Sequence, residues 1–205
     1  MRDPTLLALA SGGVIRVAPG TSIHASGENE IELRAGRIYL DFPPGAKPFV
    51  LQTGGGVVEH AGTQFEVLAT GRDVRVRVRE GSIRMHTTGG TETVEKGGEL
   101  FVPDDGRVAR RSIPTYGPDW EWVEAIAPPF EIENRPLDEF LAWVARETGR
   151  QVEFVDTRAQ DVASQTRLHG SVEDLKPLDA LQGVLSTTSL RFQVDGGTIR
   201  VSSRP

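Results

Sequence analysis

Cysteine is absent from all 205 residues of the sequence. Its absence excludes disulfide bonds, thiolate metal sites and cysteine nucleophiles. It leaves the cellular compartment open, because oxidising and reducing compartments both accept a chain without cysteine. Any chemistry or binding must therefore come from other side chains.

Long apolar runs and a surplus of positive charge are also missing. The apolar run at residues 6–10 ends at Ser11-Gly12-Gly13, well short of the ~18 residues that cross a bilayer. Residues 1–113 hold 14 Lys and Arg against 14 Asp and Glu, and residues 114–205 hold 9 against 15. Because nucleic acids and anionic membranes bind clustered positive charge, we expect no nucleic-acid partner and no membrane insertion by this segment.

Short runs of alternating apolar and polar residues fill residues 1–113, and turn residues such as Pro19-Gly20 and Gly89-Gly90 separate them. A period of two is typical of strands with one face on a core. The turns recur about every 8 to 12 residues, as in β-sandwiches. We therefore expect an all-β domain over residues 1–113, either a β-sandwich or a β-roll.

The clearest strand pair is formed by residues 64–68 and 74–79, with a chain reversal expected at 71–73. Apolar residues such as Phe65 and Val76 are expected to point into the core. The polar residues between them are expected to face water.

Three arginines, Arg75, Arg77 and Arg79, form a comb on the expected polar face of the second strand. We expect a solvated strand face with carboxylates nearby, and exposed ion pairs contribute little stability. On this interpretation, Arg77→Ala is a mild substitution. An acidic partner for the comb is the alternative.

Residues 114–129 interrupt the strand pattern with four prolines, and Trp120 and Trp122 stand two residues apart. Large aromatic side chains in such a connector are expected to wedge two domains together. We therefore expect a stiff connector at 114–129 and a domain boundary within it.

Residues 130–205 contain an internal repeat, in which Arg135-Pro136-Leu137-Asp138 and Lys176-Pro177-Leu178-Asp179 each open a helical pattern. Each helix carries one apolar stripe at i, i+3 or i+4, and i+7. Strands are expected at 130–133, 152–155, 166–172, 190–194 and 198–201. The overall prediction is a mainly β chain with an α+β part, in which a small βαβ-repeat domain follows the all-β domain.

Ordered motifs carry a family resemblance across nearly the whole chain. In the first part they are Leu33-Arg34-Ala35-Gly36-Arg37-Ile38-Tyr39, Gly62-Thr63-Gln64-Phe65-Glu66-Val67 and Val74-Arg75-Val76-Arg77-Val78-Arg79-Glu80-Gly81-Ser82-Ile83. In the second part they are Phe130-Glu131-Ile132, Pro136-Leu137, His169-Gly170-Ser171-Val172 and Pro177-Leu178-Asp179-Ala180-Leu181. The chain resembles the periplasmic region of FecR-type regulators, in which a FecR domain precedes a domain similar to the secretin/TonB short N-terminal (STN) domain.

The resemblance implies a noncatalytic periplasmic module of a regulator anchored in the inner membrane. Such a regulator relays a signal from a TonB-dependent outer-membrane receptor to an extracytoplasmic-function sigma factor by protein–protein binding. In the family, a cytoplasmic anti-sigma segment and one membrane helix precede the FecR domain, and this sequence contains neither. Contact with the sigma factor is therefore expected only through a segment absent from this chain. An envelope scaffold or secretion-apparatus component is the alternative, because similar small domains pack in secretin rings.

No catalytic motif is recognisable, and we expect neither an enzyme nor a cofactor. Gly54-Gly55-Gly56 lacks the lysine and helix of a phosphate loop and is interpreted as a turn. The second alternative is a cupin-like metal enzyme that uses Glu59, His60 and His86. Glu59 and His60 are adjacent, however, and adjacent strand residues point to opposite faces. His24 and His169 are distant in sequence from these three residues.

A partner-binding site is expected on an unpaired sheet edge of the C-terminal domain, because edge N–H and C=O groups can accept a strand from another protein. The candidate edges are residues 166–172 and 190–201. Their expected outward residues are Arg167, His169, Arg191 and Gln193. The helix surface around Asp138, Glu139 and Arg146 is the competing surface.

Overall fold

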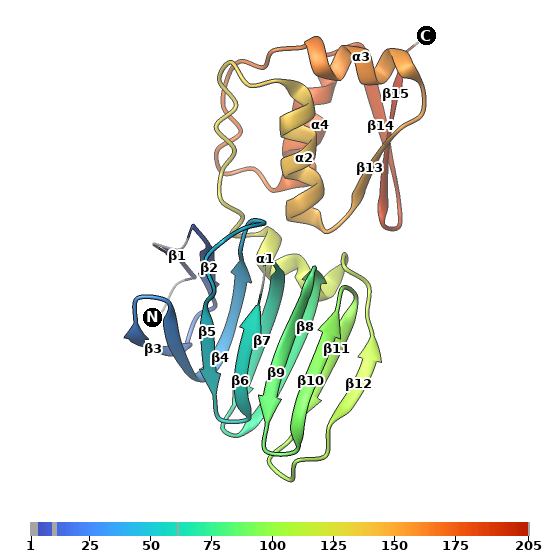
Figure 1. Ribbon diagram of the computed structural model, residues 1–205. Helices are drawn as coiled ribbons and strands as arrows, with labels where there is room; N and C mark the ends of the chain where they lie inside the picture. Colours follow the sequence, from blue (N-terminus) through green and yellow to red (C-terminus); the bar gives the residue numbers. More distant parts are fainter. Residues whose placement is uncertain (1–3, 10–11, 61, 205) are drawn as a thin grey trace. The chain divides into compact units, whose positions relative to one another are not determined.

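The computed structural model describes residues 4–9, 12–60 and 62–204. It divides into two compact units, Met1–Pro114 and Thr115–Pro205, called here the β unit and the α+β unit. Figure 1 shows that strands make up the first unit and that the second contains both helices and strands. The expected fold class, mainly β with an α+β part, is confirmed.

The described residues of the β unit form twelve strands in one curled sheet (Figure 1). Its main path runs β10-β9-β6-β5-β4-β7-β8-β11-β12, with β1 paired to β2, and both β2 and β3 paired to β4. The strands are β1 (Thr5–Ala8), β2 (Val14–Val17), β3 (Ser22–Gly27), β4 (Glu30–Asp41), β5 (Val50–Thr53), β6 (Gly56–His60), β7 (Gln64–Thr70), β8 (Asp73–Glu80), β9 (Ser82–Thr87), β10 (Gly90–Glu95), β11 (Gly98–Val102) and β12 (Ala109–Ser112).

Strand β4 belongs to both halves of the curled sheet. Its first residues pair with β3 and β5, and its last residues pair with β2 and β7. The change occurs at Gly36, whose φ of 103° suits glycine alone. A Cβ there would lie 2.5 Å from Thr21 Cα, and Thr21 Oγ1 accepts a hydrogen bond from the Arg37 N–H at 3.0 Å. The bend therefore depends on a backbone approach that only glycine permits.

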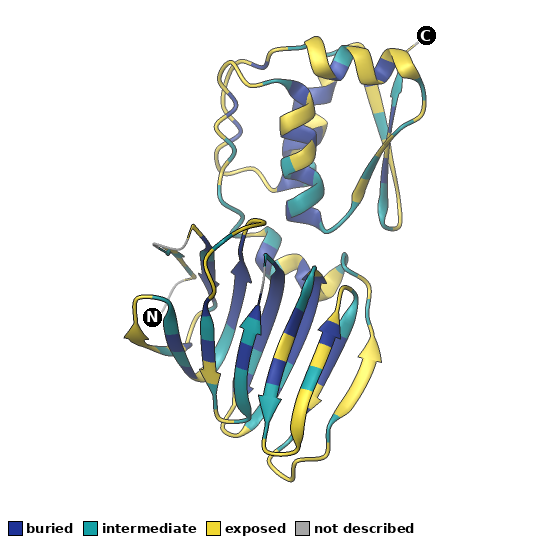
Figure 2. Cartoon of the chain, viewed as in Figure 1, coloured by how far each residue is buried: buried dark blue, intermediate teal, exposed yellow. Residues whose placement is uncertain are grey.

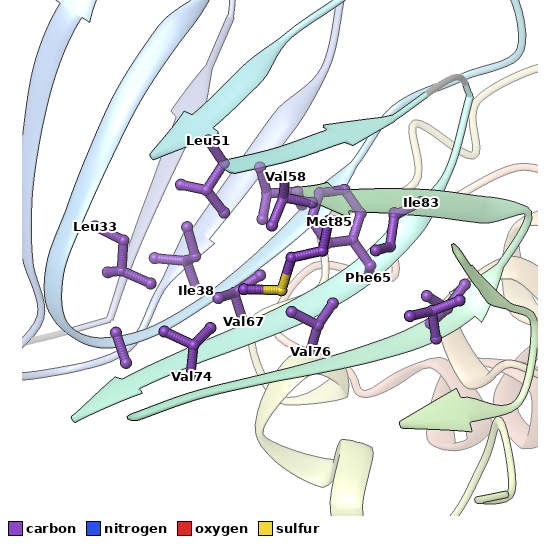
Figure 3. Packing of buried hydrophobic residues seen from close by; sticks show 14 of the residues in the cluster. Leu33, Ile38, Leu51, Val58, Phe65, Val67, Val74, Val76, Ile83 and Met85 are labelled. Carbon is purple, nitrogen blue, oxygen red and sulfur yellow. The ribbon is translucent and has the colours of Figure 1, made fainter. Parts of the chain in front are cut away.

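The core lies between the two halves of the sheet, where side chains of both halves meet (Figure 3). Leu51 and Met85 come from one half, and Phe65 and Val76 come from the other. All four are fully buried. The expected inward register of the central hairpin is confirmed, with Phe65 opposite Val78 across β7 and β8.

The opposite face of this hairpin contradicts the expectation that its polar residues face water. Glu66, Arg77 and Arg79 are buried, with exposed fractions of 0%, 3% and 1%. Glu66 and Glu99 of the neighbouring strands lie beside Arg75 and Arg77 because β7, β8 and β11 pair in register. The arginine comb is thus part of a buried charged layer and not a solvated face.

The glycines at 54–56 are explained by close packing at the β5–β6 turn. A Cβ at Gly56 would lie 2.2 Å from the carbonyl oxygen of His86, and one at Gly54 would lie 2.7 Å from that of Gly71. These contacts agree with the interpretation of 54–56 as a turn.

The α+β unit contains a three-stranded sheet with one layer of helices packed on it. Strand β13 runs parallel to β15, and β14 pairs with β15 as an antiparallel hairpin. Figure 1 shows α2 and α4 side by side, with α3 above them. The elements are η1 (Pro118–Trp120), α1 (Glu121–Glu124), α2 (Leu137–Thr148), β13 (Gln151–Phe154), α3 (Thr157–Gln165), α4 (Pro177–Ser186), β14 (Leu190–Asp195) and β15 (Thr198–Ser203).

Both expected repeat helices are present. In α2 the residues Leu137, Phe140, Leu141 and Val144 form a buried stripe, and Figure 2 shows that α2 has both buried and exposed residues. The helix ends at Gly149, which adopts the left-handed conformation of a C-terminal cap at φ 63°. The repeat thus predicted the helices and the core that they share.

Three local expectations differ from the structure of this unit. Residues 130–133 and 166–172 form no regular strands, although an isolated bridge pairs Pro136 with Arg167 where the two segments run side by side. Helix α3 was not expected. Its core contacts are the small residues Ala159 and Ala163, which leave almost no apolar stripe in the sequence. Among the described residues, no helix combines the length and apolarity required to cross a membrane.

Candidate docking surface

The candidate site is an extended ribbon made of residues 130–136 and 166–172. The Asn134 N–H donates to the Leu168 carbonyl at 2.8 Å, and the Leu168 N–H donates to the Arg135 carbonyl at 2.9 Å. Because peptide groups alternate in direction along an extended chain, the groups of Arg167 and His169 face away from residues 130–136. No described residue bonds to those outward groups. Residues 167–169 therefore present a free backbone edge.

The imidazole of His169 is held beside this edge by Glu133. His169 Nδ1 lies 2.8 Å from Glu133 Oε1, and the Gly170 N–H donates to Glu133 Oε2 at 3.1 Å. The hydrogen bond with His169, followed by that from Gly170, lowers the pKa of Glu133 below its usual value. Because the side chains of Glu133 and His169 are both exposed, Glu133 holds His169 and Gly170 in place and leaves the edge accessible.

An apolar groove borders the edge, between residues 166–172 and α4. Its floor contains Leu168, Val172 and Val184, and Leu175 is 46% exposed at its rim. Apart from its chain neighbours and the backbone of α4, no heavy atom lies within 4 Å of the place where a Gly183 Cβ would stand, so this helix face leaves the groove open. A free backbone edge beside an apolar groove has the geometry for accepting an extended peptide.

The other two expected site residues lie on a different edge. Arg191 and Gln193 are exposed on β14, an edge strand of the three-stranded sheet. Arg191 Nε donates to Ser202 Oγ at 3.1 Å on the neighbouring strand. Figure 1 shows the ribbon and β14 on opposite sides of α2 and α4. The structure therefore separates the four residues into two surfaces, Arg167 with His169 and Arg191 with Gln193.

The competing helix surface is less suited to docking. Asp138 and Glu139 are exposed in the first turn of α2, where Arg135 Nε donates to Glu139 Oε2 at 2.7 Å. This carboxylate is already paired. The groove beside residues 166–172, in contrast, has an apolar floor next to a free backbone edge.

The histidine and glutamate residues considered for a metal centre do not converge. Glu59 Oε2 lies 3.3 Å from His86 Nε2 on the exposed face of β6 and β9. The side chain of His60 is on the opposite face, 8% exposed and stacked on Phe42 with ring centroids 3.7 Å apart. Burial lowers the pKa of His60 to about 4. Within residues 4–9, 12–60 and 62–204, no group of three His, Asp or Glu side chains could hold a metal ion.

A known family model matches the first part of the chain. Residues 4–84 match the family model described as FecR protein. The FecR resemblance is confirmed. This FecR match spans β1 to the first residues of β9, including the motifs at 33–39 and 62–67. It does not include β10 to β12 or the α+β unit, so the similarity of that unit to an STN domain stays a prediction. No curated protein matches the chain.

Solved structures extend the fold comparison over the full length. Two crystal structures titled "putative anti-sigma factor", from Parabacteroides distasonis ATCC 8503, align with TM-scores of 0.50 and 0.51. Each alignment covers 100% of this chain and 96% of the other at 14% identity. At this identity the likeness shows a shared fold for both units beyond the FecR match.

Proposed function

We propose that this chain is a noncatalytic module of a FecR-type signalling regulator, located in the periplasm. It relays a signal from a TonB-dependent outer-membrane receptor to an extracytoplasmic-function sigma factor. The FecR match over residues 4–84 supports the regulatory role. The anti-sigma title of the two structural neighbours agrees with it. Contact with the sigma factor belongs to a segment outside this chain.

The observation that carries the proposal is the free edge at residues 167–169 beside its groove. A strand of the receptor's periplasmic domain pairs with the outward peptide groups of Arg167 and His169, and main-chain hydrogen bonds supply affinity. One apolar side chain of that strand enters the groove over Leu168, and Leu175 covers it. The exposed guanidinium of Arg167 and the His169–Glu133 pair then select among partners by charge.

Two substitutions at one position separate backbone docking from side-chain docking. His169→Pro removes an outward N–H and leaves the inward bonds of Leu168 in place. His169→Ala removes the same imidazole but keeps the N–H. We expect the proline variant to weaken binding at least about tenfold, as loss of main-chain hydrogen bonds does. The alanine variant should stay close to wild type.

The measurement is a calorimetric titration of the full chain with the periplasmic N-terminal domain of the cognate TonB-dependent receptor. Circular dichroism checks that each variant is folded. Equal binding by folded His169→Pro would exclude this edge, and Gln193→Ala then tests the β14 surface. Absence of binding by wild type would refute the receptor role, and self-association in sedimentation would favour the envelope-scaffold alternative.

A further inference from the structure

A second surface lies on the β unit, on the outer face of β7, β8 and β11. The in-register strands align one cross-strand row of four residues, namely Leu68, Arg75, Phe101 and Ala109. A shallow hollow follows this row and is also lined by Thr70, Asp73, Glu99 and Arg111. Phe101 is 38% exposed in it, one of the few large apolar side chains so exposed among the described residues.

Arg75, one of the two arginines in this hollow, has no carboxylate within hydrogen-bond distance. Its Nη2 lies 3.6 Å from Glu66 Oε1 and its Nε lies 3.8 Å from Glu99 Oε2, beyond hydrogen-bond distance. The buried Nε has no hydrogen-bond partner. Burial, and then the neighbouring Arg77, lower the pKa of Arg75 below that of an ordinary arginine. The guanidinium is therefore held in a place that disfavours its charge.

Both carboxylates near Arg75 make their short hydrogen bonds with other arginines, and Glu66 Oε1 lies 3.6 Å from Arg75 Nη2. Glu99 accepts hydrogen bonds from Arg77 Nε at 2.6 Å and from Arg111 Nε at 2.5 Å. Glu66 accepts one from Arg37 Nε at 2.7 Å. Only the long contacts remain for Arg75, which stands at the hollow with 27% of its side chain exposed. A carboxylate brought from outside cannot reach the buried Nε, but it can approach the exposed part of this guanidinium more closely than Glu66 and Glu99 do.

We propose that this hollow docks an acidic segment of a partner protein, with one glutamate or aspartate side chain of the partner on Arg75. The adjacent apolar side chain of the segment contacts Phe101 and Leu68. A protein segment fits better than a free phosphate for two reasons. Three of the four residues in the cross-strand row are apolar, and a dianion would also meet the carboxylates of Asp73 and Glu99. A single carboxylate on an aliphatic stem adds only one charge and contributes apolar contact.

The probe is a blocked peptide of alternating glutamate and leucine, titrated into the full chain at low salt and followed by amide resonances in NMR. We expect shifts concentrated at Leu68, Arg75 and Phe101. Arg75→Gln should weaken binding about tenfold, since it removes a charge-assisted hydrogen bond. Phe101→Ser should weaken it severalfold. The matched control is Arg84→Gln, an exposed arginine paired with Glu59 on the other half of the sheet.

Each further outcome decides the proposal. The same peptide with glutamine in place of glutamate should not bind, and binding that survives this change would overturn it. Unaltered affinity in folded Arg75→Gln, or no binding by wild type, would also overturn it. Inorganic phosphate bound at these residues as tightly as the peptide would make the hollow an ion site instead. Because the ribbon edge belongs to the α+β unit, this test and the receptor test fail independently.

Discussion

Arg77 Nε donates a hydrogen bond of 2.6 Å to Glu99 Oε2, and both side chains are nearly buried, with 4% and 7% of their surface exposed. The two residues face each other across β8 and β11. On the other side of Arg77, Glu66 Oε1 on β7 lies 3.8 Å from Arg77 Nη1. This relationship replaces the solvated arginine comb expected from the alternating pattern, and it changes the expected cost of mutation.

Arg77→Ala should be strongly destabilising and not mild. Removing one partner of a buried ion pair leaves a buried carboxylate with poorer compensation, which costs about 3–5 kcal/mol. Urea unfolding of the full chain measures the change, with Arg84→Ala as the exposed control, expected within about 0.5 kcal/mol of wild type. Equal midpoints for the two variants would contradict the buried network.

Stability should fall between pH 6.5 and about 4 because of His60. The pKa of His60 is lowered to about 4 in the folded protein by burial, against 6.5 for an ordinary histidine. Over this interval the unfolded chain binds a proton that the folded chain does not, so lowering the pH favours unfolding. The contribution is roughly 2–3 kcal/mol across the interval.

The check on His60 is the free energy of unfolding at pH 7 and at pH 4.5, for wild type and His60→Phe. The variant keeps an aromatic ring beside Phe42 and has no proton to bind. It should lose less stability than wild type on acidification. Parallel losses in the two proteins would show that His60 is not the group responsible.

Core substitutions in the central hairpin should unfold the β unit. Phe65 and Val76 are fully buried between the two halves of the sheet. Phe65→Ala should cost about 3–5 kcal/mol, and Val76→Asp should cost more because it buries an unpaired carboxylate. Circular dichroism melts provide the measurement. A wild-type melting temperature for Val76→Asp would refute the inward register of β8.

The two units should fold independently, with a boundary between Arg111 and Phe130. Each has its own hydrophobic core, one around Phe65 and one around Phe140. Limited proteolysis is expected to cut first within this connector and release two resistant fragments. First cleavage inside residues 65–78, together with failure of residues 115–205 to fold alone, would count against independence.

Sequence periodicity alone determined the local elements whose stabilising contacts repeat at fixed spacing. The alternation around Val76 predicted a strand and its core face, and the spacing of Leu137, Phe140 and Leu141 predicted α2. Both patterns indicate that one face of the element is buried, and this can be inferred without knowing which element packs against that face. Helix α3 was missed because Ala159 and Ala163 reach the core with side chains too small to mark a stripe.

Only the tertiary structure decided what lies on the second face of each element. Whether Arg77 meets water or Glu99 depends on the pairing of β8 with β11, because Arg77 and Glu99 are 22 residues apart in the chain. Arg167 and Arg191 have equal standing as outward residues in the sequence, yet one lies beside an apolar groove and the other on β14. Period-two patterns indicate which side chains share a face, but strand pairing determines which charges and hollows that face contains.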